Sequence, residues 1–257
     1  MSDYPTLKVA IDDKGVALCT FNRPEVRNAL SEEMVNDIRA VLNDLRERTD
    51  VCALIFTGAG GKAFISGADI AELRERGRMD ALRRINNTLM RDIELFPLPT
   101  IAAISGYALG GGCEFALACD MRIAARGAKF GQPEVGLGIL PGAGATYRLQ
   151  RTVGPGLARE LIFTGRIIDA ETALGMGLVN RLVDDDTLLE TAYALAHEIA
   201  KNSRMALRFA KIAMGAVDDR GMEANMVIES TAQAVLFEDD EKMRRMGDFL
   251  ARRAKKT

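Results

Sequence analysis

The sequence predicts an α/β fold with largely buried strands, and two observations support this. Three short apolar runs, at residues 51–56, 99–104 and 121–125, have the length of strands, and the first two lead into glycine-containing loops. Continuous apolar runs of this length are typical of strands that are covered on both faces. Strand, glycine loop and helix also recur along this part of the chain, which favours α/β architecture.

The chain begins with a predicted β-hairpin and an amphipathic helix. Apolar residues alternate at period two over residues 7–11 and 16–20, on either side of the turn-forming segment 12–15. Ser31 can cap a helix whose first turn carries two glutamates, a favourable place for negative charge. The apolar residues that follow form one helical stripe: Met34, Ile38, Val41, Leu42 and Leu45.

The C-terminal part is predicted to be mainly helical. From about Asp169 the glycine loops become rare, and helices are expected over residues 187–200, 203–217, 222–237 and 241–254. No low-complexity linker separates this part from the rest. We therefore expect a core over residues 1–195 and a helical C-terminal region over residues 196–257.

The composition narrows the class of protein. The 257 residues carry a formal net charge of -2 with a pI of about 5.7, so no overall field favours nucleic acid or an anionic membrane. No apolar run approaches the ~20 residues that span a bilayer. The first residues lack the basic and apolar regions of a signal peptide, so we expect a cytoplasmic protein. Because aromatic residues make up only 5% and tryptophan is absent, we expect an aliphatic core.

Cysteine and histidine offer little for metal binding or nucleophilic catalysis. The four cysteines lie in apolar segments without a CxxC pair, so we expect reduced, buried thiols rather than zinc ligands or disulfides. The single histidine, His197, falls in a predicted amphipathic helix. A His-based metal site or a Ser-His-Asp triad is therefore hard to build, and no metal site is expected.

The most informative segment is 105–114, in which three consecutive glycines precede Cys113 and Glu114. Glycines let a ligand approach the backbone closely, and a helix that begins among them leaves its first N–H groups without intrahelical partners. Such groups can hold a developing oxyanion, which makes the Gly111 N–H a candidate donor. Glu114 lies in a very apolar helix start. It is either an acid/base group or a glutamate that caps its own helix or pairs with a distant arginine.

Two further positions complete the predicted site. Glu134 lies in a loop rich in glycine and proline, so it is either a second acid/base group or a solvated loop acid. Gly67 interrupts the local pattern just before a helical spacing begins, which makes the Ala68 N–H a candidate second donor. Amides from Ala68 and Gly111 would form a two-point oxyanion hole, in which each donor is worth ~2.7–4 kcal/mol.

Two glycine patterns argue against a nucleotide-binding fold. Residues 58–63 resemble a phosphate loop, but Phe56 stands where the first glycine belongs and Ala63 replaces the Ser/Thr that would hold magnesium. Residues 106–112 do not match GxGxxG. Neither a P-loop nor a dinucleotide fold gains support.

Taken in order, these motifs resemble the crotonase, or enoyl-CoA hydratase/isomerase, superfamily nearly end to end. The similar segments are 22–24, 28–30, 64–70, 106–114, 119–120, 130–134, 138–144, 161–165 and 177–179. The resemblance implies a crotonase-like spiral of repeated ββα units with a helical C-terminal region used in trimerisation, commonly within a hexamer that is a dimer of trimers. It also implies a CoA thioester whose carbonyl oxygen lies between the Ala68 and Gly111 amides.

The resemblance further implies a reaction. In the hydratase pattern, Glu114 activates water for attack at C3 and Glu134 protonates C2, which gives syn addition of water to a trans-2-enoyl-CoA and a 3-hydroxyacyl-CoA product. Single-carboxylate isomerases usually keep only one of the two positions, so the presence of both favours a hydratase. An isomerase or a specialised dehydratase of the same superfamily is the alternative, because some dehydratases keep both. Two retained glutamates and the acidic pI count against an idle CoA-binding or RNA-binding relative.

The resemblance also implies which residues of this sequence contact the substrate, because their positions match those of substrate-binding residues in the family. The CoA- and substrate-binding residues that the resemblance implies are Val26, Arg27, Asp69, Ile70, Ala71, Phe249 and Arg252. The first two match the stretch along the nucleotide part of CoA, the next three match the pantetheine and acyl segment, and the last two approach CoA from a neighbouring subunit. CoA is part of the substrate, and no other cofactor is implied. Ala145 and Tyr147 stand where hydratases usually have Gly and Gln, which leaves acyl-chain preference open.

Overall fold

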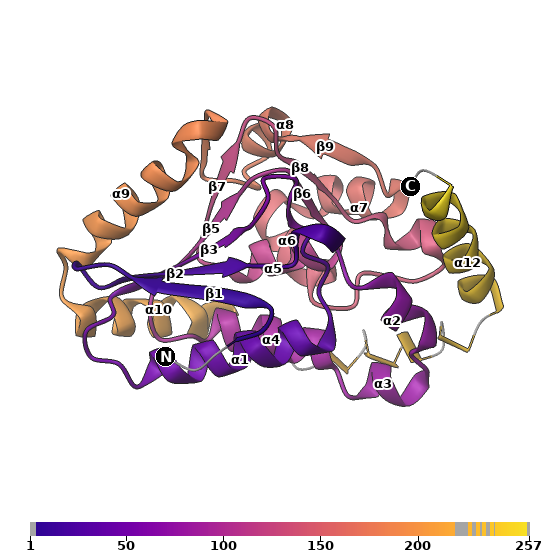
Figure 1. Ribbon diagram of the computed structural model, residues 1–257, viewed down its shortest axis with the longest axis horizontal. Coiled ribbons are helices and arrows are strands. Elements are labelled where there is room, and N and C mark those ends of the chain that lie inside the picture. The colour runs from indigo at the N-terminus through magenta and orange to yellow at the C-terminus, as the bar shows by residue number, and fades with distance from the viewer. Residues whose placement is uncertain are drawn as a thin grey trace.

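The computed structural model (Figure 1) describes residues 4–218, 226–227, 230–231, 233–234, 237–238 and 240–255. Two sheets organise the described chain. The larger sheet has the strand order β1 (Leu7–Ile11), β2 (Val16–Phe21), β3 (Ala53–Gly58), β5 (Thr100–Ile104), β7 (Met121–Ala125) and β10 (Arg181–Val183). The smaller sheet has the order β4 (Ala63–Ile65), β6 (Tyr107–Leu109), β8 (Lys129–Gly131) and β9 (Ile167–Asp169).

The chain alternates between the two sheets as it advances. β3, β5 and β7 enter the larger sheet in parallel, and each is followed by a strand of the smaller sheet, β4, β6 and β8, which also pair in parallel. The hairpin β1–β2 and the pair β8–β9 are antiparallel. This is the repeated ββα spiral that the resemblance implied, and the hairpin and the three apolar runs predicted from the sequence are all strands.

Helices connect and cover the strands. They are η1 (Pro24–Val26), α1 (Glu32–Arg46), α2 (Ile70–Glu75), α3 (Arg78–Leu82), α4 (Ile85–Glu94), α5 (Gly111–Ala118), η2 (Pro133–Leu137), α6 (Ala145–Val153), α7 (Pro155–Thr164), α8 (Ala170–Gly175), η3 (Asp185–Thr187), α9 (Leu188–Ala200), α10 (Arg204–Asp218) and α12 (Asp240–Ala254). Ser31 caps α1 as predicted, accepting a hydrogen bond from the Met34 N–H. Three of the four predicted C-terminal helices are confirmed as α9, α10 and α12. The fourth, at residues 222–237, falls largely outside the described residues.

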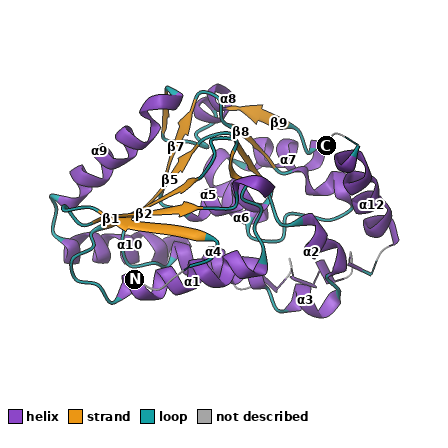
Figure 2. Cartoon of the chain, viewed as in Figure 1, coloured by secondary structure: helices purple, strands orange, loops and turns teal. Residues whose placement is uncertain are grey.

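Period-two alternation divides the larger sheet between two cores. In β3, Ala53 and Ile55 pack toward α9, whereas Leu54 and Phe56 pack into the main core with α1, α4 and α5. Figure 2 shows α9 on one side of the strands and α1 and α4 on the other. Because both faces are covered, these strands read as continuous apolar runs in the sequence.

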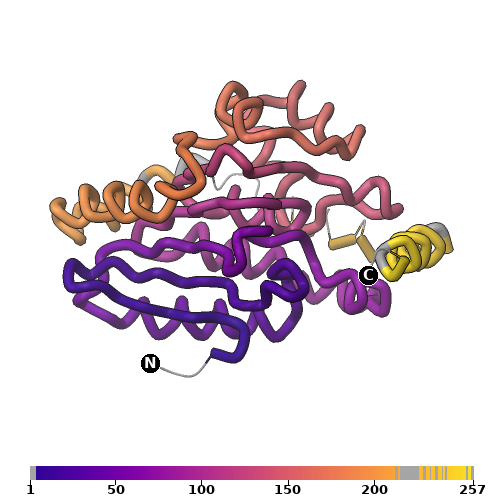
Figure 3. The backbone as a smooth tube through the Cα atoms, turned by 45° about the horizontal axis from the view of Figure 1, so that its top comes forward, coloured from indigo at the N-terminus to yellow at the C-terminus, as the bar shows by residue number. Residues whose placement is uncertain are grey.

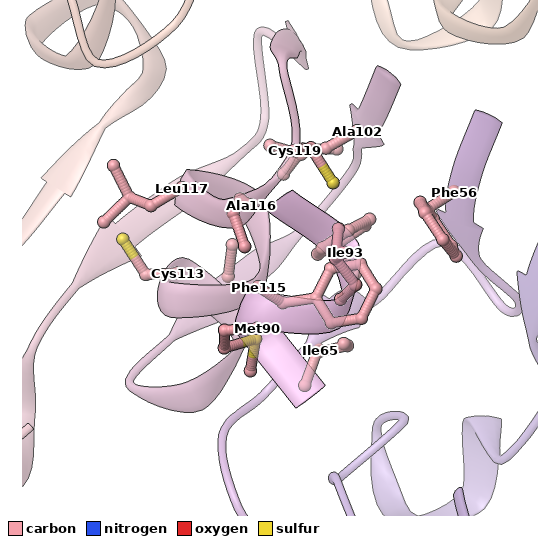
Figure 4. Close-up of a cluster of buried hydrophobic side chains, with 14 of the residues drawn as sticks. Phe56, Ile65, Met90, Ile93, Ala102, Cys113, Phe115, Ala116, Leu117 and Cys119 are labelled. Atoms are coloured by element: carbon pink, nitrogen blue, oxygen red, sulfur yellow. The ribbon is translucent and has the colours of Figure 1, made fainter. Parts of the chain in front are cut away.

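An aromatic cluster lies at the centre of the main core, where composition predicted only aliphatic packing. Phe115 of α5 meets Phe21 and Phe56 edge-on, with ring centroids 5.1 and 4.9 Å apart, and Phe64 also packs against it. Figure 4 shows Phe115 projecting from α5 among side chains of α4 and the strands. Edge-to-face ring pairs of this kind add about 0.5–1.5 kcal/mol beyond area burial. Few aromatic residues are present, but the fold gathers them where they fix the position of α5.

The C-terminal helices reach opposite ends of the molecule. α10 lies at one end of the long axis and α12 at the other (Figure 3). α12 packs against α2 and η2 of its own chain, where Lys242 Nζ donates to the Arg76 carbonyl at 2.6 Å and Arg245 Nη1 donates to the Gly136 carbonyl at 3.2 Å. The boundary predicted at residue 195 falls within α9, and the division into two regions stays a prediction. Among the described residues, the helices are too short or too polar to cross a membrane.

Candidate active site

Two backbone amides meet where β4 and β6 end. Gly111 is the first residue of α5, and Ala68 follows β4. A Cβ placed on Gly111 would lie 3.5 Å from the Ala68 nitrogen, so the two backbone segments pass close to each other. Within the described part of the chain, neither the Ala68 N–H nor the Gly111 N–H donates to a protein acceptor. The arrangement provides two neighbouring hydrogen-bond donors that are free for a ligand.

The loop at residues 23–30 fixes the position of Ala68. Leu30 pairs with Ala68 in an isolated parallel bridge, and its N–H donates to the Gly67 carbonyl at 2.9 Å. The buried Asn28 side chain donates to the carbonyls of Ala63 at 2.8 Å and Ala59 at 3.1 Å, which fastens this loop to the β3–β4 connection.

The predicted nucleotide-side residues follow from this loop. The Arg27 carbonyl accepts a hydrogen bond from the Ser66 N–H at 3.2 Å, two residues before Ala68. The structure therefore brings Val26 and Arg27 to the Ala68 side of the site.

Glu114 lies one turn into α5 and is only 2% exposed. Its Oε1 accepts hydrogen bonds from the Ala143 N–H at 2.8 Å and the Ala145 N–H at 3.1 Å, in the turn that precedes α6. Burial raises the pKa of Glu114, while these backbone hydrogen bonds and the positive charge of Arg148 oppose the rise. Glu114 is thus neither a helix cap nor the direct ion-pair partner of an arginine, the two alternatives that the sequence left open.

Glu134 reaches the same place from the other side. It lies in η2, and a Cβ on Gly110 would be only 2.7 Å from its Oε1, so its carboxyl group packs against the backbone just before α5. When its side-chain nitrogen faces Glu134, the buried Gln132 amide can donate to both carboxyl oxygens, at 3.1 and 3.2 Å. Burial first, and then the negative charge of Glu114, raise the pKa of Glu134 well above its ordinary value. Glu134 is therefore not a freely solvated loop acid.

The remaining predicted substrate-binding residues divide between two elements. Asp69 caps α2 through the Ala71 N–H at 3.1 Å and also pairs with Arg23 at 3.6 Å, and Ile70 begins the helix directly after it. Asp69, Ile70 and Ala71 follow Ala68 immediately in the sequence and lie on its side of the site.

Phe249 and Arg252 lie on α12, the helix that packs against α2 and η2. Phe249 is 36% exposed, and Arg252 Nε donates to the Asp248 carbonyl one turn earlier in the helix. Within the described residues, no hydrogen bond or ion pair joins either side chain to Ala68, Gly111 or the two glutamates.

Sequence reasoning missed the roles of two buried polar residues beside the glutamates. Gln132 directly precedes the Pro-Glu pair, and a glutamine two residues from a candidate acid was the available signal. Arg148 is buried at 3% exposure between the buried residues Tyr147 and Leu149. An arginine inside an apolar helical stripe signals a buried partner, but the partner itself lies 54 positions away.

Thiols and histidine contribute nothing to this chemistry. Burial raises the pKa of Cys113 to about 12 and that of Cys119 to about 12, so both thiols stay protonated. His197 Nε2 lies 2.6 Å from Asp12 Oδ2, between α9 and the β1–β2 turn. No cluster of three or more metal-ligating side chains occurs among the described residues.

The geometry combines an anion site with two carboxyl groups of different character. Two free amides can stabilise negative charge that develops on a ligand oxygen. Burial raises the pKa of both glutamates, that of Glu134 well above its ordinary value, whereas two backbone hydrogen bonds and the charge of Arg148 oppose the rise at Glu114. Carboxyl groups whose environments separate their pKa values in this way can serve as an acid and a base in one reaction.

Comparison with known proteins gives a consistent result. The family described as Enoyl-CoA hydratase/isomerase matches residues 12–256. The chain is 41% identical over 252 residues to a short-chain-enoyl-CoA hydratase of Clostridium acetobutylicum, covering 95% of each protein. It is 40% identical over 243 residues to a crotonyl-CoA hydratase of Syntrophomonas wolfei, covering 94% of each. Its structure is similar to that of an enoyl-CoA hydratase from Bacillus anthracis, with a TM-score of 0.79, 36% identity and 96% of each chain covered.

Proposed function

Because the chain belongs to the enoyl-CoA hydratase/isomerase family, we propose that Glu114 and Glu134 are the acid/base pair with which this enoyl-CoA hydratase adds water to a trans-2-enoyl-CoA. The observation that carries the proposal is the meeting of both carboxyl groups at the start of α5, beside the free amides of Ala68 and Gly111. A hydratase needs these parts together, because water must be deprotonated and carbon protonated around one enolate.

The proposed reaction follows from the position and charge of each group. The thioester carbonyl oxygen accepts hydrogen bonds from the Ala68 and Gly111 N–H groups. Ionised Glu114 takes a proton from water as its oxygen bonds to C3, and the C2=C3 electron pair moves toward the thioester to form the enolate. Protonated Glu134 then gives its proton to C2, which collapses the enolate to the 3-hydroxyacyl-CoA. Proton transfer from Glu114 back to Glu134, through solvent, restores the resting pair.

The surroundings of the two glutamates support this division of roles. The pKa of Glu134 is raised well above its ordinary value, which favours the protonated form that a proton donor needs. Glu114 accepts hydrogen bonds from two amides and faces the charge of Arg148, both of which favour the carboxylate. The proposal therefore keeps Glu114 as the base and Glu134 as the proton donor.

The decisive measurement is the loss of enoyl-thioester absorbance with crotonyl-CoA. We expect turnover by the wild type, and losses of about 10²–10⁴-fold in Glu114→Gln and in Glu134→Gln. Glu33→Gln, which removes an exposed carboxylate on α1, serves as the matched control and should keep full activity. Equal inactivity of the wild type and both site variants, with CoA still bound, would refute the hydratase assignment.

The proposed reaction also bears on the need for a cofactor. Amide donors and carboxyl groups supply all the charge stabilisation and proton transfer above, so we propose that no cofactor is needed beyond the CoA carried by the substrate. Turnover should be unchanged after dialysis against EDTA. A loss that added metal restores would contradict this.

We also propose assembly into a homotrimer or a dimer of trimers. Large apolar side chains are exposed on α7 and α10, among them Phe163 at 74%, Phe209 at 63% and Met214 at 74%. Burial of these side chains against a neighbouring subunit would remove apolar surface from water and so favour assembly. Light scattering coupled to gel filtration should give about three or six times the 27.9 kDa of the chain, and a monomer would contradict the proposal. The cytoplasmic location stays a prediction.

A further inference from the structure

Arg148 occupies an unusual position beside the site. It is only 3% exposed, and its Nη2 lies 2.6 Å from an oxygen of Glu94, which comes from the end of α4 and has a side chain 30% exposed. Its Nη1 donates to the Ala143 carbonyl at 3.1 Å. The guanidinium also lies over the Tyr147 ring, 4.8 Å from the centroid. A buried arginine held from three directions has one defined orientation.

The carbonyl that Arg148 holds belongs to the turn that orients Glu114. The N–H of Ala143 donates to Glu114 Oε1, and so does the N–H of Ala145 two residues later. Ala143 is therefore hydrogen-bonded on both sides: its carbonyl accepts from Arg148 and its N–H donates to Glu114.

Gly144 shows how closely the guanidinium packs on this turn. It has a φ of 119°, and a Cβ at this position would overlap Arg148 Nη1. Only glycine leaves room for the guanidinium to lie across the turn. The packing of Arg148 against the turn therefore depends on glycine at position 144.

We propose that Arg148 is the positioning residue for Glu114, anchored by Glu94 and acting through the Ala143–Ala145 turn. The inference rests on the proposed function, because it concerns how one of the two carboxyl groups is aimed at water. Arg148 does not touch the substrate in this scheme. Its positive charge also favours the ionised form of Glu114.

Substitution at Arg148 provides the first test. Arg148→Met removes the hydrogen bonds to Glu94 and Ala143 but keeps an unbranched side chain, and we expect kcat to fall about 10- to 100-fold with KM nearly unchanged, as for a displaced catalytic group. Arg148→Lys keeps the charge but not the two-pronged geometry, so it should recover only part of kcat. Arg151→Met is the matched control, because Arg151 lies on the same helix and over the same ring at 5.6 Å but is exposed.

A double-variant cycle separates positioning from general support of the fold. In a Glu114→Gln background, Arg148→Met should cause no further loss of kcat, because the group that it aims is already absent. A further loss in that background equal to the loss in the wild type would overturn the proposal. Thermal unfolding of each variant identifies any that fail to fold, and Glu94→Gln, which leaves Arg148 in place, then supplies the same cycle.

Crystal structures of the wild type and Arg148→Met complete the test without depending on turnover. The proposal expects the 143–145 turn to shift and at least one hydrogen bond to Glu114 Oε1 to be lost. Retention of both bonds in Arg148→Met would overturn it. Lack of crotonyl-CoA hydration by the wild type would instead refute the proposed function, and the structural comparison would still decide whether Arg148 positions Glu114.

Discussion

At the scale of single residues, the two glutamates differ through their neighbours. Glu114 accepts two backbone hydrogen bonds and lies near a buried cation, whereas Glu134 is held by the Gln132 amide and repelled by Glu114. The two carboxyl groups are coupled, because protonation of one removes a negative charge that raises the pKa of the other. The negative charge of Glu114 raises the pKa of Glu134, so the two carboxyl groups titrate together close to the free amides.

Glu134→Gln should separate activity from stability. The amide keeps the shape of the side chain but carries no transferable proton, so kcat is expected to fall about 10²–10⁴-fold. The melting temperature measured at pH 7.5 should not fall, because a neutral amide of the same shape replaces a carboxyl group whose ionisation is disfavoured in the folded protein. A large loss of stability with retained turnover would show that Glu134 is structural.

The raised pKa of Glu134 also predicts how the stability of the protein depends on pH, and the same variant tests this. Because the pKa of Glu134 is raised in the folded protein, the unfolded chain releases the proton first as pH rises above about 4.3, and the folded state loses stability relative to it until its own raised pKa is passed. Glu134→Gln lacks this loss. Its melting temperature relative to wild type should therefore increase from pH 4 to pH 8, as scanning calorimetry can measure. A difference that stays constant with pH would contradict the raised pKa.

At the scale of elements, the beginning of α5 brings the site together. Gly110 adopts a φ of 51° and a ψ of −121°, which turns the chain from β6 into α5 and leaves the Gly111 N–H unpaired. Phe115, one turn further on, packs against three phenylalanines of the strands and holds the helix in place. Buried Arg122 donates to the carbonyls of Ala116 and Cys119 and so stabilises the other end of α5.

Gly110→Ala tests whether this turn is essential. A Cβ at this position would lie 2.7 Å from Glu134 Oε1 and would require a backbone conformation that L-residues avoid. We expect a drop in kcat of at least 100-fold in a crotonyl-CoA assay. Gly156→Ala in α7, where nothing lies within 4 Å of the added methyl group, should leave kcat unchanged. If the two variants had comparable kcat values, the close packing of the Glu134 carboxyl group against Gly110 would not be essential for catalysis.

At the scale of the whole molecule, contacts distant in sequence join the first and last parts of the described fold. The β1–β2 turn is closed by Asp12, which accepts from the Lys14 and Val16 N–H groups and also meets His197 of α9, 185 positions away. Burial raises the pKa of Asp12, but its hydrogen bonds, led by that with His197, lower it overall. Its contribution to stability is therefore present above a pH of about 4 and is lost as pH falls further.

His197→Ala should destabilise the protein without affecting catalysis. The pair is partly exposed, with side chains 27% and 23% accessible, so we expect a loss of about 1 kcal/mol and a fall in melting temperature of about 2–4 °C. kcat with crotonyl-CoA should match the wild type, since the only histidine lies outside the proposed machinery. A catalytic defect at unchanged stability would show that His197 has a second role.

The order of the strands and helices follows from the amino-acid sequence, which also predicts the reacting groups. The hairpin, α1 and the buried strands follow from local periodicity and capping, and the glycine segments with Glu114, Glu134 and Ala68 carry the family resemblance. The way in which these groups are held depends on contacts between segments that are distant in the sequence. The hydrogen bonds of Glu114 to the 143–145 turn, the packing of Glu134 against Gly110 and the Glu94–Arg148 pair join segments 24 to 54 positions apart. Such pairings depend on how the spiral superimposes its turns, so no local pattern records them.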